Sequence, residues 1–237
     1  AGWFRSDGVS IKAHTALIDL QVVIAADQTS ADSVISSLQG AFEDKKTMGV
    51  ILRINSPGGS PVQAGQIYDE IKRLKVLHPK TPLYAVVDDI CASGGYYVAA
   101  GADKIFVDKA SIVGSIGVLM DGFGFTQTMQ KLGVERRLLT AGENKGFLDP
   151  FSPVDPKHEA FARQMLEEIH AQFIAVVREG RGKRLKETPE MFSGLVWSGE
   201  KSIELGLADG LGNVDSVARD VIKAEEIVDY TRQDSLV

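Results

Sequence analysis

The chain has 237 residues, of which 26 are basic and 32 acidic, so its net charge at neutral pH is −6. A nucleic-acid partner needs a basic surface, and we therefore expect none. The hydrophobic share of 44% and the charged share of 24% are typical of a water-soluble globular domain and exclude a disordered or collagen-like chain. The single cysteine, Cys91, excludes an internal disulfide and a cysteine zinc cluster.

No run of residues approaches the roughly 18 apolar positions that a membrane-spanning helix needs. The sequence starts at Ala1-Gly2-Trp3 without a basic and apolar leader. We therefore expect either a cytosolic protein or a mature or trimmed form of a longer one.

Strand-like apolar runs alternate with stretches of helical periodicity, which predicts a layered α/β domain. We expect strands over residues 16–24, 49–54, 83–87, 105–107, 116–118 and 134–139. Helices are expected over residues 30–42, at 92–100, over 158–178, and near the end within 197–209 and 214–227. A further helix is expected from Pro61 onward, with Ser60 as its cap.

The longest predicted helix, His158 to Arg178, carries an apolar stripe with a spacing of four residues: Phe161, Met165, Ile169 and Phe173. The stripe indicates a core or subunit contact rather than a cofactor site. The polar last residues, about 228–237, predict a flexible tail. Because no internal repeat or linker interrupts the pattern, we expect one catalytic domain over residues 1–237.

Two glycine-rich loops each follow a predicted strand and precede a predicted helix, where backbone N–H groups are free to bind an anion or oxyanion. In the first loop, Ser56-Pro57-Gly58-Gly59, the paired glycines allow positive φ and the close approach of another backbone. An ordinary tight turn explains this loop alone equally well. Neither loop matches a phosphate or dinucleotide motif, so no nucleotide cofactor is expected.

The second loop, Ala92-Ser93-Gly94-Gly95, places a serine at a sharp junction between strand and helix. There the Ser93 oxygen can be exposed while the Gly94 N–H points the same way, as in a nucleophile elbow, although the Gly-x-Ser-x-Gly pattern itself is absent. The alternative is that Ser93 only caps the helix.

A serine nucleophile needs a base. The four histidines have no setting that suggests a triad, and we expect them to be structural or exposed to solvent: His14, His78, His158 and His170. A lysine serves instead where desolvation lowers its pKa. Lys145 is the candidate, because it lies on the loop Gly142–Phe147 among small and apolar residues, and a solvated surface lysine is the alternative.

Two further pairs of polar residues are expected to be structural rather than catalytic. Ser198 and Lys201 match the Ser-x-x-Lys motif of penicillin-binding enzymes, but the companion motifs are missing, and Ser198 is expected to cap a helix. Asp88 and Asp89 are neighbours at a strand end, where side chains point to opposite faces, so a shared acid/base or metal site is not expected.

Together these motifs resemble the signal peptide peptidase A family, the S49 serine peptidases, in the short form with one catalytic domain per chain. The resemblance runs from about Ala16 to about Ala218. Its matching segments are Ile54–Gly59, Ala92–Tyr97, Val113–Val118, the Lys145 loop and Trp197–Asp209. The first motif also occurs in Clp protease subunits, which share the crotonase-like fold, and the later segments narrow the match. The implied fold is α/β, with layered β-α repeats of the crotonase/ClpP type and a long helix towards the C-terminus.

The resemblance implies a role for each matching residue. Ser93 is the nucleophile, Lys145 its general base, and Ser115 orients the lysine amine. Gly59 and Gly94 donate the N–H groups of the oxyanion hole, and Gly58 shapes the loop. No metal or other cofactor is implied.

The implied substrates are remnant signal peptides or other extended apolar peptides. The family is tethered to the bacterial inner membrane by an N-terminal helix, with the catalytic domain on the outer, periplasmic face, and this sequence does not contain that helix. In the family the serine and lysine come from different domains or protomers. We therefore hypothesise a homo-oligomeric ring in which Ser93 of one subunit meets Lys145 of the next.

Two other functions are compatible with such a fold. One is an acyl-CoA hydratase or isomerase of the crotonase type, in which the same N–H groups would polarise a thioester, with acidic residues in place of Ser93 and Lys145. The other is a non-catalytic scaffold. The presence of both the serine and the lysine argues against it.

Overall fold

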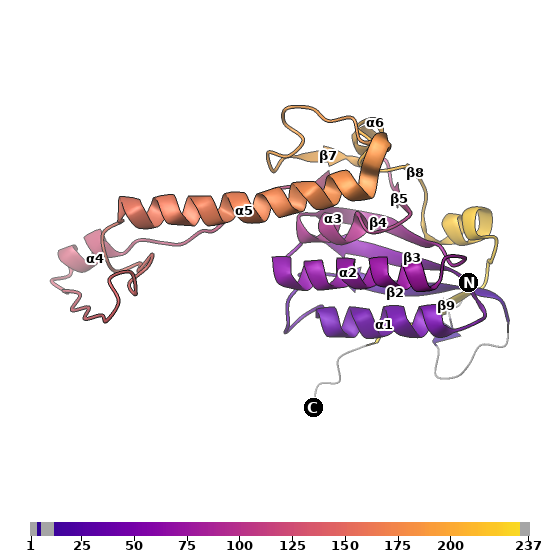
Figure 1. The fold of residues 1–237 in the computed structure, drawn as a ribbon, viewed down its shortest axis with the longest axis horizontal. Coiled ribbons are helices and arrows are strands. Elements are labelled where there is room, and N and C mark those ends of the chain that lie inside the picture. The colour runs from indigo at the N-terminus through magenta and orange to yellow at the C-terminus, as the bar shows by residue number, and fades with distance from the viewer. Residues whose placement is uncertain (1–3, 6–11, 233–237) are drawn as a thin grey trace. The chain divides into compact units, whose positions relative to one another are not determined.

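The computed structural model describes residues 4–5 and 12–232 (Figure 1). The chain forms two compact units, one of residues 1–117 with 173–237 and one of residues 118–172. The helix α5, Pro156–Arg181, contributes its first part to the second unit and its last part to the first. That one domain covers the whole chain stays a prediction.

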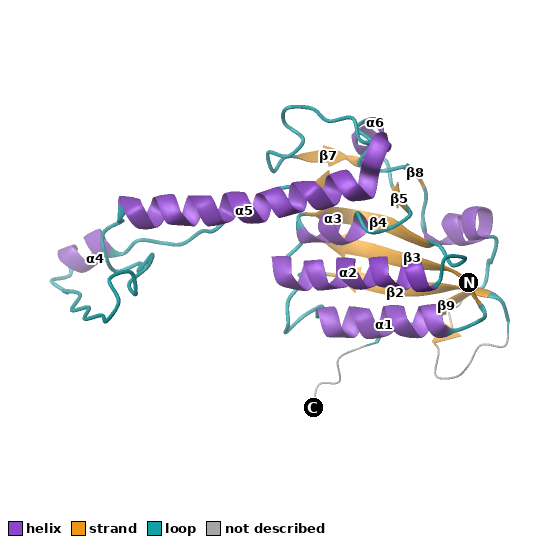
Figure 2. Cartoon of the chain, in the orientation of Figure 1, coloured by secondary structure: helices purple, strands orange, loops and turns teal. Residues whose placement is uncertain are grey.

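Within the described residues, the first unit is built on a nine-stranded sheet. Its strands are drawn in orange in Figure 2. Its main path runs in the order β1 Phe4–Arg5, β9 Ile227–Asp229, β2 His14–Gln21, β3 Thr47–Ser56, β4 Leu83–Ala92, β5 Lys104–Val107 and β8 Gly210–Leu211. All pairs on this path are parallel, whereas β7 Val196–Ser198 is antiparallel to β6 Ile112–Gly114, which pairs with the end of β4.

Helices cover the sheet because its central strands are apolar on both faces. The helices α1 Ala31–Glu43, α2 Pro61–Leu77 and α3 Gly94–Ala99 lie side by side over one face (Figure 1). Within β3, Val50, Leu52 and Ile54 belong to the main core cluster, while Ile51 belongs to a second cluster with Val217. The expected layered α/β fold and the long helix towards the C-terminus are confirmed.

The first two helices begin where the sequence predicts. Ser30 accepts a hydrogen bond from the Ser33 N–H at 3.2 Å, and Ser60 accepts one from the Gln63 N–H at 3.3 Å. Both cap residues have extended backbone, and Pro61 is the first residue of α2. These two serines show what ordinary capping looks like in this chain.

Two predicted strands are wrong. The strand expected at 116–118 lies instead at Ile112–Gly114, because Ser115 has a φ of 54° and its carbonyl accepts from the Gly117 N–H at 2.9 Å, which turns the chain. Residues 134–139 are exposed and form no strand within the described part of the chain. Within residues 118–172, all of which the structure describes, the chain forms helices and loops but no strand with which this segment could pair.

The end of the chain also differs from the prediction. The region 197–209 holds β7 and only the short helix α6, Gly199–Glu204, while 214–227 holds α7, Val214–Ser216, and a π-helical turn, Val217–Ile222. The flexible tail does not begin at about 228, because β9 pairs with β2 and the Tyr230 hydroxyl donates to Asp44 at 2.5 Å. Residues 233–237 of that prediction lie outside the described residues.

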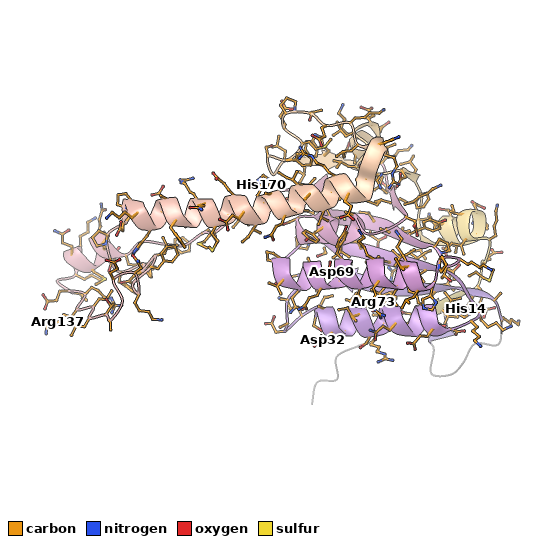
Figure 3. All side chains as sticks on the ribbon, viewed as in Figure 1. His14, Asp32, Asp69, Arg73, Arg137 and His170 are labelled. Carbon is orange, nitrogen blue, oxygen red and sulfur yellow. The ribbon has the colours of Figure 1, made fainter. Side chains whose placement is uncertain are left out.

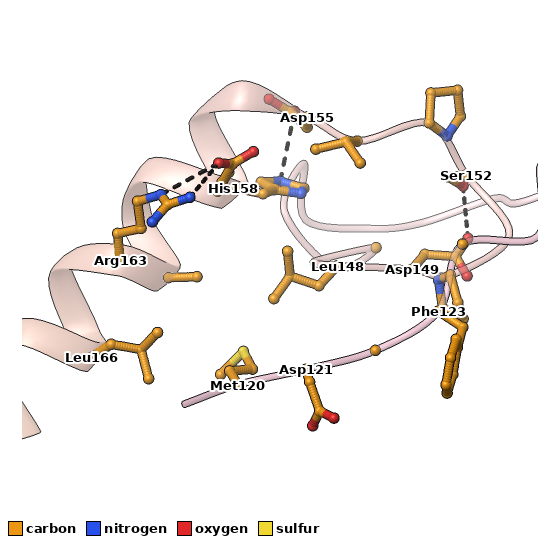
Figure 4. A pocket seen from close by; sticks show the side chains of 18 residues that line it. Met120, Asp121, Phe123, Leu148, Asp149, Ser152, Asp155, His158, Arg163 and Leu166 are labelled. Atoms are coloured by element: carbon orange, nitrogen blue, oxygen red, sulfur yellow. Dashed lines mark hydrogen bonds and ion pairs between the residues drawn. The ribbon is translucent and has the colours of Figure 1, made fainter. Parts of the chain in front are cut away.

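The second unit contains α4, Thr126–Lys131, the loops around it and the first part of α5. The rings of Phe125 and Phe151 stack at 5.6 Å between centroids, and the Phe125 N–H donates to Pro150 at 2.8 Å. A cavity of about 490 Å³ lies within this unit, between the segment 120–124, the loop 148–155 and α5 (Figure 4). No helix in the described ranges has the length and apolar character needed to cross a membrane.

The apolar stripe of α5 is divided between the units. Phe173 belongs to the core of the first unit, where its ring lies 5.2 Å from that of Tyr97. Phe161 lies in the second unit, with its ring 5.8 Å from that of Phe147, and remains 63% exposed. The core role predicted for the stripe is therefore confirmed at Phe173.

Candidate active site

Ser93 lies on a strained turn between the end of β4 and the start of α3. Its backbone has φ 51° and ψ −124°, a conformation that non-glycine residues rarely adopt and that concentrates at functional sites. The Ser93 N–H donates to the Gly114 carbonyl at 2.8 Å, and the Ser93 carbonyl accepts from the Tyr97 N–H at 3.0 Å. The main chain is therefore held firmly from both sides.

The Ser93 hydroxyl does not act as a helix cap. Unlike Ser30 and Ser60, it makes no capping hydrogen bond, and its backbone is not extended. The side chain is half-buried. The alternative interpretation of Ser93 as an N-cap is thus wrong, and its oxygen is available for other chemistry.

The loop of Gly58 and Gly59 packs directly against this turn. Gly58 has φ 106°, and a Cβ there would lie 2.7 Å from the Gly94 nitrogen and 2.8 Å from the Ser93 Cβ. Gly59 has φ 150°, and a Cβ there would lie 2.2 Å from the Ile24 carbonyl oxygen. Both positions therefore require glycine, and the loop is more than an ordinary turn.

Two backbone N–H groups beside Ser93 find no acceptor among the described residues. Within residues 12–232, no hydrogen bond engages the N–H of Gly59 or that of Gly94. The two residues are neighbours, since a Cβ built on Gly94 would lie 3.3 Å from the Gly59 nitrogen. Two free donors next to a serine oxygen can stabilise the oxyanion of a tetrahedral intermediate.

Ser115 also lies close in space to the turn that carries Ser93. It follows Gly114, the residue that accepts from the Ser93 N–H, and its own N–H donates to the Leu195 carbonyl at 2.8 Å. The first unit therefore brings together Ser93, Ser115 and the three glycines.

Lys145 belongs to the second unit. It lies in a turn in which its N–H donates to the Gly142 carbonyl at 3.0 Å, and its side chain is exposed. The side-chain oxygen of the neighbouring residue, Asn144, lies 3.2 Å from His158 Nε2. The predicted serine and lysine are therefore carried by different units of the chain.

The histidines have structural contacts. His14, labelled in Figure 3, is buried in β2 with its ring nitrogens 2.8 Å from the Lys12 carbonyl and from the Tyr230 hydroxyl. His78 ends α2 and packs 5.6 Å from the Phe42 ring.

The remaining polar patterns are structural as well. Ser198 accepts from the Lys201 N–H at 3.2 Å and caps α6, as predicted, while Lys201 Nζ lies 2.9 Å from Glu204. Asp88 lies 3.9 Å from Arg53, and burial raises the pKa of its carboxyl. No group of three potential metal ligands occurs in the described ranges.

Comparison with known proteins identifies the family. Residues 75–228 match the model of Peptidase family S49, and residues 9–113 match that of Clp protease. The chain belongs to peptidase family S49. The resemblance inferred from the motifs is confirmed, and so, at the level of the family, is the prediction of a serine peptidase.

This S49 chain covers only part of the length of each of three relatives. The Na(+)/H(+) antiporter NhaA of Brucella abortus is 46% identical over 190 residues, which are 80% of this chain and 26% of that protein. The putative signal peptide peptidase SppA of Enterococcus faecium is 29% identical over 209 residues, 88% of this chain and 60% of the relative. A putative protease of Synechocystis is 30% identical over 203 residues, 86% of this chain and 71% of the relative. The chain therefore spans about a quarter of the Brucella protein.

Two residues near the glycine loop have contacts that the sequence did not predict. Ile24 forms a parallel bridge with Gly59, and Ser56 accepts a hydrogen bond from the Gly58 N–H at 3.1 Å. Ile24 gave no sequence signal beyond a strand end. Ser56 is part of the first glycine-rich motif, but only the fold shows which way its hydroxyl points.

Proposed function

We propose that this S49 chain is a serine endopeptidase that works through a Ser93/Lys145 dyad. The observation that carries the proposal is the strained Ser93 turn beside the free N–H groups of Gly59 and Gly94. The Lys145 amine takes the Ser93 proton as the serine oxygen attacks a peptide carbonyl. The two N–H groups stabilise the resulting oxyanion, and Lys145 returns the proton to the leaving amine. Ser115 orients the lysine amine.

The two halves of the dyad suggest an assembly. Lys145 is exposed and belongs to a different unit from Ser93. The second unit also exposes large apolar side chains, among them Leu139 at 96% and Phe123 at 80%, which are typical of a contact surface. We infer a homo-oligomeric ring in which Lys145 of one protomer completes the site of its neighbour.

The substrates we propose are remnant signal peptides or other extended apolar peptides. A relative carries the name of a putative signal peptide peptidase. The Ile24–Gly59 bridge joins two segments that also expose apolar side chains, Val22 at 56% and Val62 at 66%. An extended peptide that adds to such an edge as a strand would meet these side chains.

We propose the cellular location from the family resemblance. We infer that the catalytic site works on the outer, periplasmic face of the bacterial inner membrane, with an N-terminal anchor of the kind that the family carries. The S49 match favours this peptidase over an acyl-CoA hydratase or isomerase, and the strained Ser93 turn opposes a non-catalytic scaffold.

Digestion of matched substrates tests the proposed function. A released signal peptide should be cleaved within its apolar segment, whereas a folded secreted protein should be cut at least about 100-fold more slowly, because its backbone reaches an extended state only by opening. Mass spectrometry of the products gives the cleaved bonds, and the Ser93→Ala variant is the control. Equal cleavage of folded and unfolded forms, or equal cleavage by the variant, would contradict the proposal.

A further inference from the structure

We propose that Ser56 is a positioning residue for catalysis, which holds the Gly58–Gly59 segment so that the Gly59 N–H faces the reacting carbonyl oxygen. This role rests on the proposed peptidase function. Ser56 does not touch the reacting atoms itself, and it acts through the glycine loop.

Ser56 lies between the two loops that form the site. It is the last residue of β3 and is fully buried. Its hydroxyl oxygen accepts from the Gly58 N–H at 3.1 Å. Its carbonyl oxygen would be 3.1 Å from a Cβ on Gly95, so its main chain also packs against the turn that carries Ser93.

A second anchor holds the other side of Gly58. The Gly58 carbonyl accepts from the Ile24 N–H at 2.8 Å, and the Ile24 carbonyl accepts from the Ser60 N–H at 2.8 Å. In a planar trans peptide the C=O and N–H point in opposite directions. Because the Gly58 carbonyl points at Ile24, the Gly59 N–H points away from Ile24. The backbone of Gly94 lies next to that nitrogen.

The loop needs such anchors because its two glycines have great backbone freedom. A flip of the Gly58–Gly59 peptide would turn the carbonyl oxygen towards the oxyanion and remove the donor. Ser56 fixes the N–H of Gly58, and Ile24 fixes its carbonyl. Without the Ser56 hydroxyl, the productive orientation keeps only one of its two anchors.

The test compares Ser56→Ala with Ser60→Ala. For Ser56→Ala we expect kcat to fall about 10- to 100-fold with KM unchanged, less than the roughly 100- to 1,000-fold loss on removal of an oxyanion donor itself. A peptide aldehyde, whose adduct with Ser93 carries the oxyanion, should lose affinity by the same factor. Ser60→Ala removes a hydroxyl from the same loop, but that hydroxyl caps α2. It should lower the melting temperature and leave kcat and aldehyde affinity unchanged.

Ser56→Cys is the second variant, because it keeps a side chain of similar size in the buried site and replaces the oxygen by a weak acceptor. It should reproduce the loss of kcat. Wild-type kcat and aldehyde affinity in either folded variant would overturn the inference, and so would equal losses in Ser56→Ala and Ser60→Ala. Failure of the peptidase proposal looks different, because then wild type would not hydrolyse peptides or Ser93→Ala would.

Discussion

Replacing Ser93 with alanine is expected to abolish peptide hydrolysis and leave the fold intact. Loss of a serine nucleophile costs about 10⁴- to 10⁶-fold in kcat, because the oxyanion donors alone give little turnover. The Ser93 hydroxyl makes no capping hydrogen bond, so the usual loss of about 0.5–2 kcal/mol for a deleted cap does not apply.

Initial rates and thermal unfolding check this prediction together. Ser60→Ala serves as the matched control, since it deletes a hydroxyl that does cap a helix and leaves the backbone N–H groups of the loop in place. Ser93→Ala is expected to lose activity and keep wild-type stability. Ser60→Ala is expected to lose stability and keep wild-type activity. A folded Ser93→Ala protein with undiminished turnover would refute the assignment of the nucleophile.

Replacing Lys145 with arginine should also remove activity, by about 10²- to 10⁴-fold, the range for a general acid/base group. The guanidinium keeps the positive charge but cannot be deprotonated near neutral pH, so it cannot take the Ser93 proton. Lys131→Arg is the control, because Lys131 is another exposed lysine of the second unit. It should keep wild-type kcat. Retained activity in Lys145→Arg would show that the base lies elsewhere.

The local parts of the fold and site could be predicted from the sequence because short-range chemistry determines them. Ser30 and Ser60 have suitable capping hydroxyls ahead of apolar helical periodicity, and both cap helices. The sequence placed the glycine loops and Ser93 between strand and helix, as the structure does.

Other parts depended on contacts between distant segments. The end of the chain from about 228 is predicted to be flexible, yet Tyr230 bonds to Asp44 and His14 across about 200 residues of chain. Ile24 became part of the site only through its bridge to Gly59. For the same reason, the pairing of Ser93 with Lys145 cannot be obtained from local pattern, since the two residues belong to different units.

A mixed assembly of two inactive variants tests the central claim most directly. Ser93→Ala and Lys145→Ala are each expected to be inactive, and they are co-assembled under conditions that allow subunits to exchange, with mixed rings verified by native mass spectrometry. If Lys145 of one protomer serves Ser93 of the next, some interfaces pair an intact serine with an intact lysine, and partial activity should return. If both residues act within one chain, every site carries a lesion. Verified mixed rings that stay inactive would then contradict the shared dyad.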